Sequence, residues 1–280
     1  MDKNLIKQFN HFKIHSQYSI CQGAIKIDDL KHYCKINKVP AIGLSDSANL
    51  CGALEFAENI SKVGTQPIIG TQINFFFKEN LGFLPLIANN IEGYKKIVNL
   101  SSKSYLENNS MSDPHCKIDD LFDNRGGFTL LTGTINGLFG KLLEKGFETE
   151  IHELFIKFRD HFKDNFYIEI QRHNDENEKE FENFLLKKSK ELEIPLIASH
   201  EVFYLNQEMY EAHDALLCIG EKTYVTEKNR LKYSNQHYLK NSEEMKIIFH
   251  DLPEALENNY NFPYRCSYKP NFSIPILPNI

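Results

Sequence analysis

The stretch His11-Phe12-Lys13-Ile14-His15-Ser16-Gln17-Tyr18-Ser19 begins as an alternating strand. Side chains on a strand alternate between its two faces, so Phe12 and Ile14 are predicted to point one way. His11, Lys13 and His15 are predicted to point the other way. Two histidines on one strand face, close to a strand end, are typical of a metal site. Lys13 is not, because a protonated ammonium has no lone pair with which to bind a cation. Whether this stretch is a working metal site or the remains of one decides what the protein does.

Size and composition favour a well-packed α/β protein. The chain has 280 residues, of which 41% are hydrophobic and 12% aromatic, enough for one large domain or two small ones. Its 38 acidic and 32 basic residues give a net charge of −6. This balance argues against a surface built mainly to neutralise phosphates, although a local basic strip remains compatible with it.

Cysteine spacing and the start of the chain indicate a cytoplasmic protein. The six cysteines include no C-x-x-C pair, so neither a zinc ribbon nor a redox pair is predicted, and we expect reduced thiols. Residues 1–10 are polar and lack the apolar core of a signal peptide. No run reaches the roughly 20 apolar residues of a membrane span, so no membrane association is expected.

Strand and helix patterns alternate along most of the chain. This alternation predicts a largely parallel sheet, open or closed into a barrel, with polar residues gathered at the carboxyl ends of the strands. The segments 108–115 and 268–280 are predicted to be a loop and a linker. After the opening strand, further strands are predicted at 41–45, 67–77, 83–88, 127–132, 166–170 and 194–198, and helices at 26–38, 53–62, 93–107, 118–122, 138–143, 151–162, 181–192, 210–219, 245–249 and 255–261.

Four polar residues near strand ends form a candidate metal site. They are His15, Asp46, His173 and Glu201, whose imidazole and carboxylate groups suit Zn²⁺ or Mn²⁺. The alternative is a set of hydrogen-bonded residues around a barrel mouth, and spacing alone favours this alternative because ligands so far apart make no motif. The sequence shows no nucleophile motif and no P-loop.

The order of several short motifs resembles a known family. His11-x-x-x-His15-Ser16-x-Tyr18-Ser19 is followed by Gly23-Ala24, and later by 52–56 (GALEF), 67–70 (PIIG), 168–173 (IEIQRH) and 251–255 (DLPEA). This series resembles the N-terminal PHP (polymerase and histidinol phosphatase) domain of bacterial replicative DNA polymerase III alpha subunits, of the proteobacterial type. The resemblance implies a distorted (β/α)7 barrel, a TIM-like fold. It also implies a PHP domain over 1–268, with 269–280 beginning the linker toward the polymerase palm domain.

Active members of this family carry nine ligands for up to three metals and act as phosphoesterases or 3′–5′ exonucleases. Three ligand positions match here, at His15, Asp46 and His173. Glu201 is a conservative replacement for an aspartate. The other positions differ: Lys13 replaces the first histidine of H-x-H, Ser47 replaces the histidine after Asp46, Gln72 replaces a glutamate, Thr134 replaces a cysteine, and Phe203 replaces the last histidine.

These departures imply a degenerate site that holds no metal and performs no catalysis. Serine, glutamine, threonine and phenylalanine supply neither anionic nor imidazole donors, and Lys13 adds a repelling charge. We expect Lys13 to pair with Asp46 or Glu201, because a buried carboxylate otherwise lacks a partner. The alternative is a residual phosphoesterase or exonuclease using Zn²⁺ or Mn²⁺ at His15, Asp46, His173 and Glu201. A freestanding phosphatase of the histidinol-phosphatase type fits less well, because the resemblance follows the polymerase branch outside the ligand positions.

The family resemblance also implies partners. In the polymerase III holoenzyme this domain packs against the palm and thumb domains and carries the docking surface for the epsilon proofreading exonuclease subunit. DNA is bound by the full polymerase. The parent polypeptide resembles a DNA-directed DNA polymerase, a nucleotidyltransferase whose Mg²⁺-dependent palm lies outside this chain. We therefore expect the chain alone to be inactive and its role to be structural and partner-binding.

Overall fold

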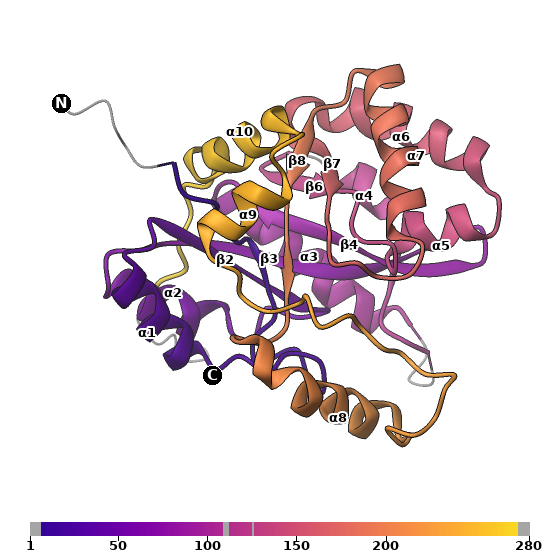
Figure 1. The fold of residues 1–280 in the computed structure, drawn as a ribbon. Coiled ribbons are helices and arrows are strands. Elements are labelled where there is room, and N and C mark those ends of the chain that lie inside the picture. Colours follow the sequence, from indigo (N-terminus) through magenta and orange to yellow (C-terminus); the bar gives the residue numbers. More distant parts are fainter. Residues whose placement is uncertain (1–6, 109–111, 125, 274–280) are drawn as a thin grey trace, which may run out of the picture.

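The computed structural model describes residues 7–108, 112–124 and 126–273. Figure 1 shows a curled sheet with helices packed around it, and α8 at one end of the molecule. The strands are β1 (Lys13–Ile14), β2 (Ala41–Ser47), β3 (Gln66–Phe77), β4 (Asn80–Ala88), β5 (Cys116–Lys117), β6 (Phe128–Leu131), β7 (Phe166–Ile170), β8 (Leu196–Ala198) and β9 (Glu201–Val202). The helices are α1 (Ile27–Asn37), α2 (Ala53–Ser61), α3 (Ile91–Leu106), α4 (Asp119–Asp123), α5 (Leu138–Glu144), α6 (Glu148–Phe162), α7 (Glu178–Leu192), α8 (Tyr210–Glu221), α9 (Ser242–Ile248) and α10 (Pro253–Asn261).

The main sheet is mixed. Its strand order is β2-β3-β4-β6-β7-β8, with β5 paired to β3. The pairs β2–β3, β6–β7 and β7–β8 are parallel, as predicted, but β4 runs antiparallel to both of its neighbours. The reversal comes from a two-residue hairpin at Lys78 and Glu79, both with positive φ (48° and 57°). This is the conformation of a tight turn that matches the twist of the flanking strands. The prediction of a largely parallel sheet is therefore wrong at β4.

The short strand β1 joins the two edges of the curled sheet. It pairs in parallel with β9, with Lys13 opposite Glu201. On its other side, the backbone N–H of Gly43 in β2 donates to the His11 carbonyl at 2.6 Å. A Cβ at Gly43 would lie 2.4 Å from the Cα of Phe12, so only glycine allows this approach. The distorted β/α barrel that the resemblance implies is confirmed as a curled mixed sheet. Residues at or just after the carboxyl ends of β1, β2, β7 and β8 meet at one mouth.

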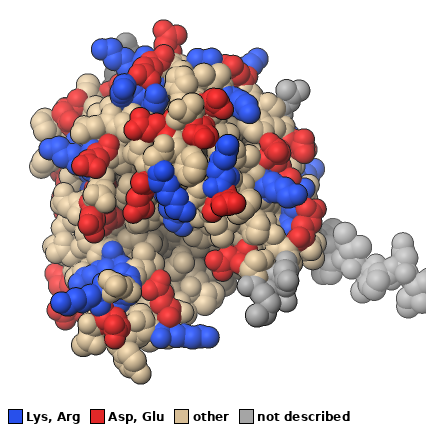
Figure 2. Space-filling model, turned by 90° about the vertical axis from the view of Figure 1, so that its right-hand side faces the viewer, with Lys and Arg blue, Asp and Glu red and all other residues tan. Residues whose placement is uncertain are grey.

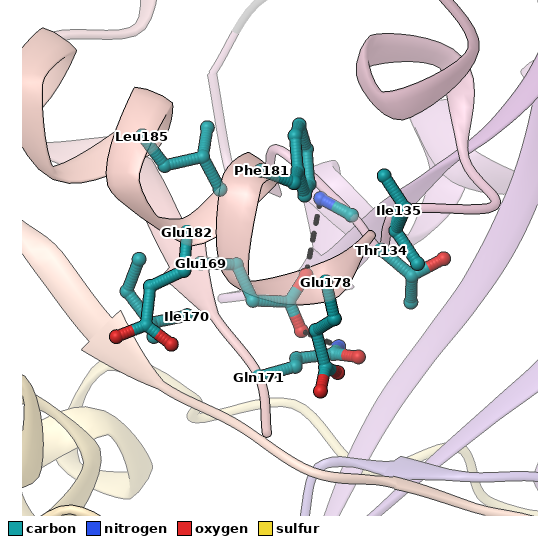
Figure 3. Close-up of a pocket in the computed structure, with 10 residues that line it drawn as sticks. Thr134, Ile135, Glu169, Ile170, Gln171, Glu178, Phe181, Glu182 and Leu185 are labelled. Carbon is teal, nitrogen blue, oxygen red and sulfur yellow. Dashed lines mark hydrogen bonds between the residues drawn. The ribbon is translucent and has the colours of Figure 1, made fainter. Parts of the chain in front are cut away.

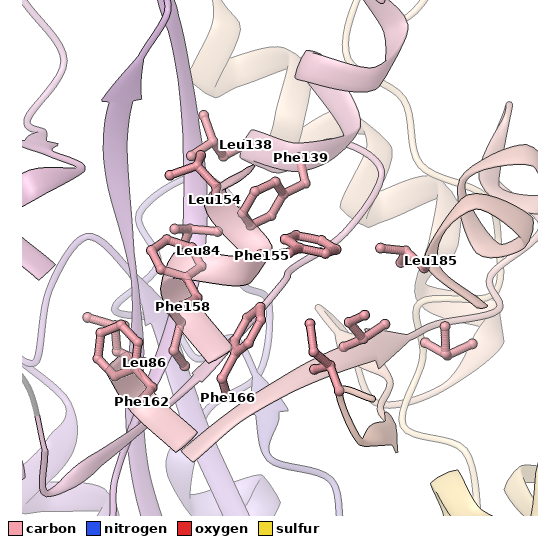
Figure 4. Packing of buried hydrophobic residues seen from close by; sticks show 14 of the residues in the cluster. Leu84, Leu86, Leu138, Phe139, Leu154, Phe155, Phe158, Phe162, Phe166 and Leu185 are labelled. Atoms are coloured by element: carbon pink, nitrogen blue, oxygen red, sulfur yellow. The ribbon is translucent and has the colours of Figure 1, made fainter. Parts of the chain in front are cut away.

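An aromatic core holds α5 and α6 against the sheet (Figure 4). The predicted apolar stripe of α6 is fully buried, and Phe155 and Phe158 meet Phe166 of β7 edge to face at centroid distances of 5.7 and 5.4 Å. Aromatic pairs in this geometry add to the stabilisation from area burial alone. A second apolar cluster packs α1 and α2 against β2 and β3. This packing fixes the strands whose ends carry the site.

The surface is mixed in charge, and the cysteine prediction can be compared with the structure. Acidic and basic side chains are interspersed over the face that Figure 2 shows. All six cysteines are free thiols. Across the described ranges, each helix falls short of the length and apolarity that a bilayer crossing requires. Residues 109–111 of the predicted loop (108–115) lie outside the described residues. Residues 274–280 of the predicted linker (269–280) also lie outside them. The domain boundary at 268 stays a prediction.

Candidate functional site

Lys13 lies at the centre of the barrel mouth with a fully buried side chain. Its Nζ is 3.4 Å from Oε1 of Glu169 and 3.5 Å from Oε1 of Glu201. Burial alone would raise the pKa of Glu201, but the charge of Lys13 and a hydrogen bond with His15 hold that pKa well below its usual range. A buried ammonium is tolerated only where carboxylates compensate for its lost hydration. The expected pairing with Glu201 is present, and Glu169 is a second partner that the sequence analysis did not single out.

His15 and Gln72 complete the hydrogen bonding around Glu201. Nε2 of His15 lies 3.0 Å from Oε1 of Glu201, and Nε2 of Gln72 donates to the same oxygen at 2.5 Å. Because Gln72 replaces an acidic residue of the family pattern, its amide adds no negative charge beside Glu201. Lys13, His15 and Gln72 therefore surround the Glu201 carboxylate, where the family pattern would place further acidic groups around a metal.

Asp46 is directed at the turn after β1 and not at Lys13. Its Oδ1 accepts from the Ser16 N–H and the Ser19 hydroxyl, both at 2.7 Å, and its Oδ2 accepts from the Ser16 hydroxyl at 2.8 Å. Burial raises the pKa of Asp46. The expected alternative pairing of Lys13 with Asp46 is therefore wrong, because three local donors already satisfy this carboxylate.

Neighbouring Ser47 is held in the same turn. Its hydroxyl donates to Oε1 of Gln22 at 2.6 Å, and its backbone N–H donates to the Ser19 hydroxyl at 3.1 Å. Both hydrogen bonds stay within the segments that pack at this corner of the mouth. Ser47 therefore acts as a structural hydroxyl at a position where the family places a histidine.

Phe203 fills the position of another family ligand with a ring. It is 2% exposed and stacks on His15 at a centroid distance of 4.4 Å and on Tyr233 at 4.8 Å. Thr134 is half-buried at the edge of the mouth, where its Oγ1 accepts from the Asn136 N–H at 3.2 Å. Thr134 also lines a small cavity together with Glu169 and Gln171, while Phe203 packs its ring against His15.

The strand faces predicted for the opening stretch are only partly observed. Lys13 and His15 do share a direction, since both reach Glu201. Phe12 and Ile14 pack in two different apolar clusters, because β1 is only two residues long and the chain turns on either side of it. His11 points away from Glu201, with Nε2 at 2.8 Å from the Lys240 carbonyl. The prediction that His11, Lys13 and His15 share one strand face is therefore wrong for His11.

A second polar group at the mouth contains residues that sequence reasoning missed. Within the described residues, the ligand-type atoms of His173, Asp175 and His237 lie within 4.8 Å of one another. Nε2 of His237 is 2.9 Å from Oδ2 of Asp175, and its Nδ1 is 3.1 Å from the Glu201 carbonyl. Nε2 of His173 accepts from the Glu201 N–H at 3.1 Å. His237 follows a polar loop far along the chain, so no local pattern marked it.

The nine positions of the family pattern do not fit a metal cluster here. An ammonium, an amide, two hydroxyls and a phenyl ring replace donors, and Asp46 is used by local donors. The group of His173, Asp175 and His237 offers suitable ligand types. However, the two imidazole rings stack in parallel, with centroids 3.9 Å apart and planes 1° apart. Imidazole lone pairs lie in the ring plane, so both rings bind one ion at about 2.0–2.1 Å only if one ring turns.

Comparison with known proteins identifies the family. Residues 11–173 match the PHP domain. The DNA polymerase III alpha subunit of Caulobacter vibrioides is 34% identical over 279 residues, which covers 97% of this chain and 24% of that protein. The corresponding subunit of Borreliella burgdorferi is 37% identical over 286 residues, and that of Vibrio cholerae is 31% identical over 276 residues. The chain spans about a quarter of the length of these relatives.

Solved structures matched at low identity include an amidohydrolase from Chromobacterium violaceum, with a TM-score of 0.48 and 9% identity over 74% of this chain and 96% of that chain. A two-domain protein of Bacteroides vulgatus, described as containing a predicted PHP-like metal-dependent phosphoesterase, matches with a TM-score of 0.41 and 11% identity over 85% of this chain and 62% of that chain. The family match and the sequence relatives carry the assignment: the chain belongs to the PHP domain family and is homologous to the DNA polymerase III alpha subunits.

Proposed function

We propose that this chain is the metal-free PHP domain of a replicative DNA polymerase III alpha subunit, with a structural and partner-docking role. The observation that carries the proposal is the buried ammonium of Lys13, held between Glu169 and Glu201 in the middle of the barrel mouth. A catalytic metal centre needs charge-matched donors and an open coordination position. Here a protein cation supplies the positive charge, and the ring of Phe203 fills the space above His15.

The proposal includes the longer polypeptide to which such a domain belongs. Relatives of about four times this length are named DNA polymerase III alpha subunits, which supports a DNA-directed DNA polymerase of chromosome replication, acting in the cytoplasm without a membrane. In that setting the Mg²⁺-dependent chemistry belongs to the palm domain. The PHP domain would pack on the palm and thumb and dock the epsilon proofreading exonuclease subunit of the holoenzyme.

Elemental analysis and a hydrolysis assay test the metal-free state together. Protein purified without chelator is analysed for zinc, manganese and iron, and then assayed with a 3′-recessed DNA and with a phosphomonoester. We expect metal contents far below one ion per chain and no hydrolysis above buffer. Stoichiometric metal, together with hydrolysis that a chelator abolishes, would overturn the proposal.

A binding measurement tests the docking role separately. Calorimetric titration of the chain with the purified proofreading exonuclease subunit is expected to show saturable binding that a chelator leaves unchanged. A heat-unfolded sample of the same chain is the control for non-specific heat. Absence of binding would contradict the docking role while leaving the metal-free state untouched.

A residual metal-dependent phosphoesterase is the second candidate, and the group of His173, Asp175 and His237 favours it. In both imidazoles Nδ1 faces an oxygen, of Glu178 for His173 and of the Glu201 carbonyl for His237, an orientation common among metal-binding histidines. If this candidate is correct, His237→Asn will lower the zinc or manganese content, whereas the same change at exposed His250 will not. Equal metal content in the two variants would contradict it.

A further inference from the structure

A small cavity lies beside the barrel mouth, where β6 and β7 end against the first half of α7. Its volume is about 10 Å³, which is room for about one water-sized sphere. Polar groups of Thr134, Glu169, Gln171 and Glu178 border it, and apolar side chains such as Phe181 and Leu185 complete the wall (Figure 3). Of the nine family positions, only Thr134 lines this cavity. It is therefore a place distinct from the degenerate metal ring.

Gln171 presents an unpaired oxygen in this cavity. The residue is 7% exposed, and its Oε1 is buried without a hydrogen-bond partner. Its Nε2 donates to Oε1 of Glu169 at 2.6 Å, so reversing the amide would place two oxygens in contact. Figure 3 shows the amide of Gln171 next to the carboxylate of Glu178. Oε1 of Gln171 and the Glu178 carboxylate are both hydrogen-bond acceptors, so a donor or a cation between them would stabilise this arrangement.

Two of the three carboxylates around the cavity face a lysine or an arginine, and the third, Glu178, faces a histidine. Arg172 binds both oxygens of Glu182, at 2.6 and 3.0 Å, and the ammonium of Lys13 faces Glu169 at 3.4 Å. Oε2 of Glu178 accepts from the backbone N–H groups of His173 and Asn174, both at 2.7 Å, and Oε1 lies 3.1 Å from Nδ1 of His173. Glu178 forms an ion pair with none of the described lysines and arginines.

We propose that this cavity binds one small monovalent cation, Na⁺, between the Gln171 amide oxygen and the Glu178 carboxylate, with the Thr134 hydroxyl at its border. Oxygen donors of this kind suit hard cations. A single positive charge balances Glu178, whereas a divalent ion would add excess charge close to Lys13. A water molecule would supply donors to Gln171 but would leave the charge of Glu178 unbalanced.

Thermal unfolding of the chain in different chlorides tests this proposal. We compare Na⁺, K⁺, Mg²⁺ and choline chloride at one ionic strength. Ligand linkage predicts a Tm higher by ~2–4 °C in Na⁺ than in choline once Na⁺ exceeds its Kd about tenfold. Glu178→Gln is expected to abolish this difference, because the new amide N–H can donate to Oε1 of Gln171 without a cation. Glu176→Gln, at an exposed position just before α7, is the matched control and should keep the difference.

Line broadening of the ²³Na resonance by the wild-type chain gives a second readout that does not depend on a variant folding. We expect the chain to broaden the ²³Na resonance, and we expect added K⁺ to reverse this broadening only weakly. Three results would each overturn the proposal: equal Tm in Na⁺ and choline, which points to a bound water; a larger rise in Mg²⁺ than in Na⁺; or an unchanged Na⁺ effect in Glu178→Gln. The proposal is independent of the proposed function, since a chelator of zinc and manganese leaves Na⁺ in place.

Discussion

The ammonium of Lys13 lies 3.4 Å from Oε1 of Glu169, and both side chains are fully buried. Glu169 lies inside β7, opposite Ile197 of β8. Its other oxygen accepts from the Gly133 N–H at 3.1 Å. Glu169 therefore ties β7 to the end of β6 as well as to β1. The Lys13–Glu169 pair therefore links β1 directly to β7 inside the barrel.

Removal of the Lys13 charge is predicted to destabilise the fold strongly. In Lys13→Met the carboxylates of Glu169 and Glu201 remain buried without a cation, a situation that costs about 3–5 kcal/mol. Urea unfolding followed by circular dichroism measures this loss. Lys13→Met combined with Glu201→Gln should recover part of it, because one buried charge is then removed. Lys35→Met, at an exposed position of α1, should change the free energy of unfolding by less than about 0.5 kcal/mol. Equal stability of Lys13→Met and wild type would contradict the cross-link.

Stability is predicted to fall between pH 6.5 and pH 4 because of buried neutral histidines. Burial lowers the pKa of His11 and of His213 to about 4, while an unfolded histidine titrates near 6.5. Between these values the unfolded chain binds more protons, so lower pH favours unfolding by about 1.4 kcal/mol per pH unit for each such group.

His213→Gln tests the sign and size of this slope. Nε2 of His213 lies 2.8 Å from the Gln22 carbonyl, a contact that a glutamine amide can preserve. Urea unfolding at several pH values should show a slope smaller by about 1.4 kcal/mol per pH unit in the variant. His32→Gln, at an exposed site, should leave the slope unchanged. The same slope in His213→Gln and wild type would refute the assignment.

The order of strands and helices could be read from the sequence because periodicity reports local burial. The stripe of α6 was predicted from Ile151 to Phe162, and all of its members are buried. The reversal at β4 could not be read in this way. Lys78 and Glu79 adopt positive φ without the glycine or asparagine that usually announces such a turn. Strand direction depends on that turn, and the apolar pattern of β4 is the same in either direction.

The site shows a similar division. The odd character of Lys13 was visible in the sequence, because an ammonium between two histidines conflicts with metal binding. Its partner Glu169 was not visible, although Tyr167 and Glu169 alternate with apolar residues along β7 and so share one face of the strand. His237 meets Asp175 across 62 positions of chain. Contacts of this range follow from the tertiary fold and from no local pattern.

Asp46 is predicted to be a structural hydrogen-bond acceptor. The stability lost on replacing it should therefore be the same with and without a chelator. Asp46→Ala deprives the Ser16 N–H and the hydroxyls of Ser16 and Ser19 of their acceptor, which should cost about 3 kcal/mol. Ser47→Ala, which removes one donor to Gln22, should cost about 1 kcal/mol. Thermal unfolding with and without a chelator measures both. A chelator that destabilises wild type but not Asp46→Ala would identify Asp46 as a ligand and contradict this prediction.

Arg172 is predicted to be irreplaceable by lysine, because its planar fork joins α7 to the segment between α9 and α10. Its guanidinium binds Glu182 at 2.6 Å, Asp251 at 2.6 Å and the Ile248 carbonyl at 2.6 Å, and it lies 5.2 Å from the Phe249 ring centroid. An ammonium reproduces neither the paired hydrogen bonds nor the stacking, so Arg172→Lys should lower the free energy of unfolding by about 1–3 kcal/mol.

Arg159→Lys is the matched control. Among the described acidic residues, Arg159 pairs only with the exposed carboxylate of its neighbour Asp160, so this change should cost less than about 0.5 kcal/mol. Similar losses in the two variants, measured by urea unfolding, would mean that the charge of Arg172 matters and its geometry does not.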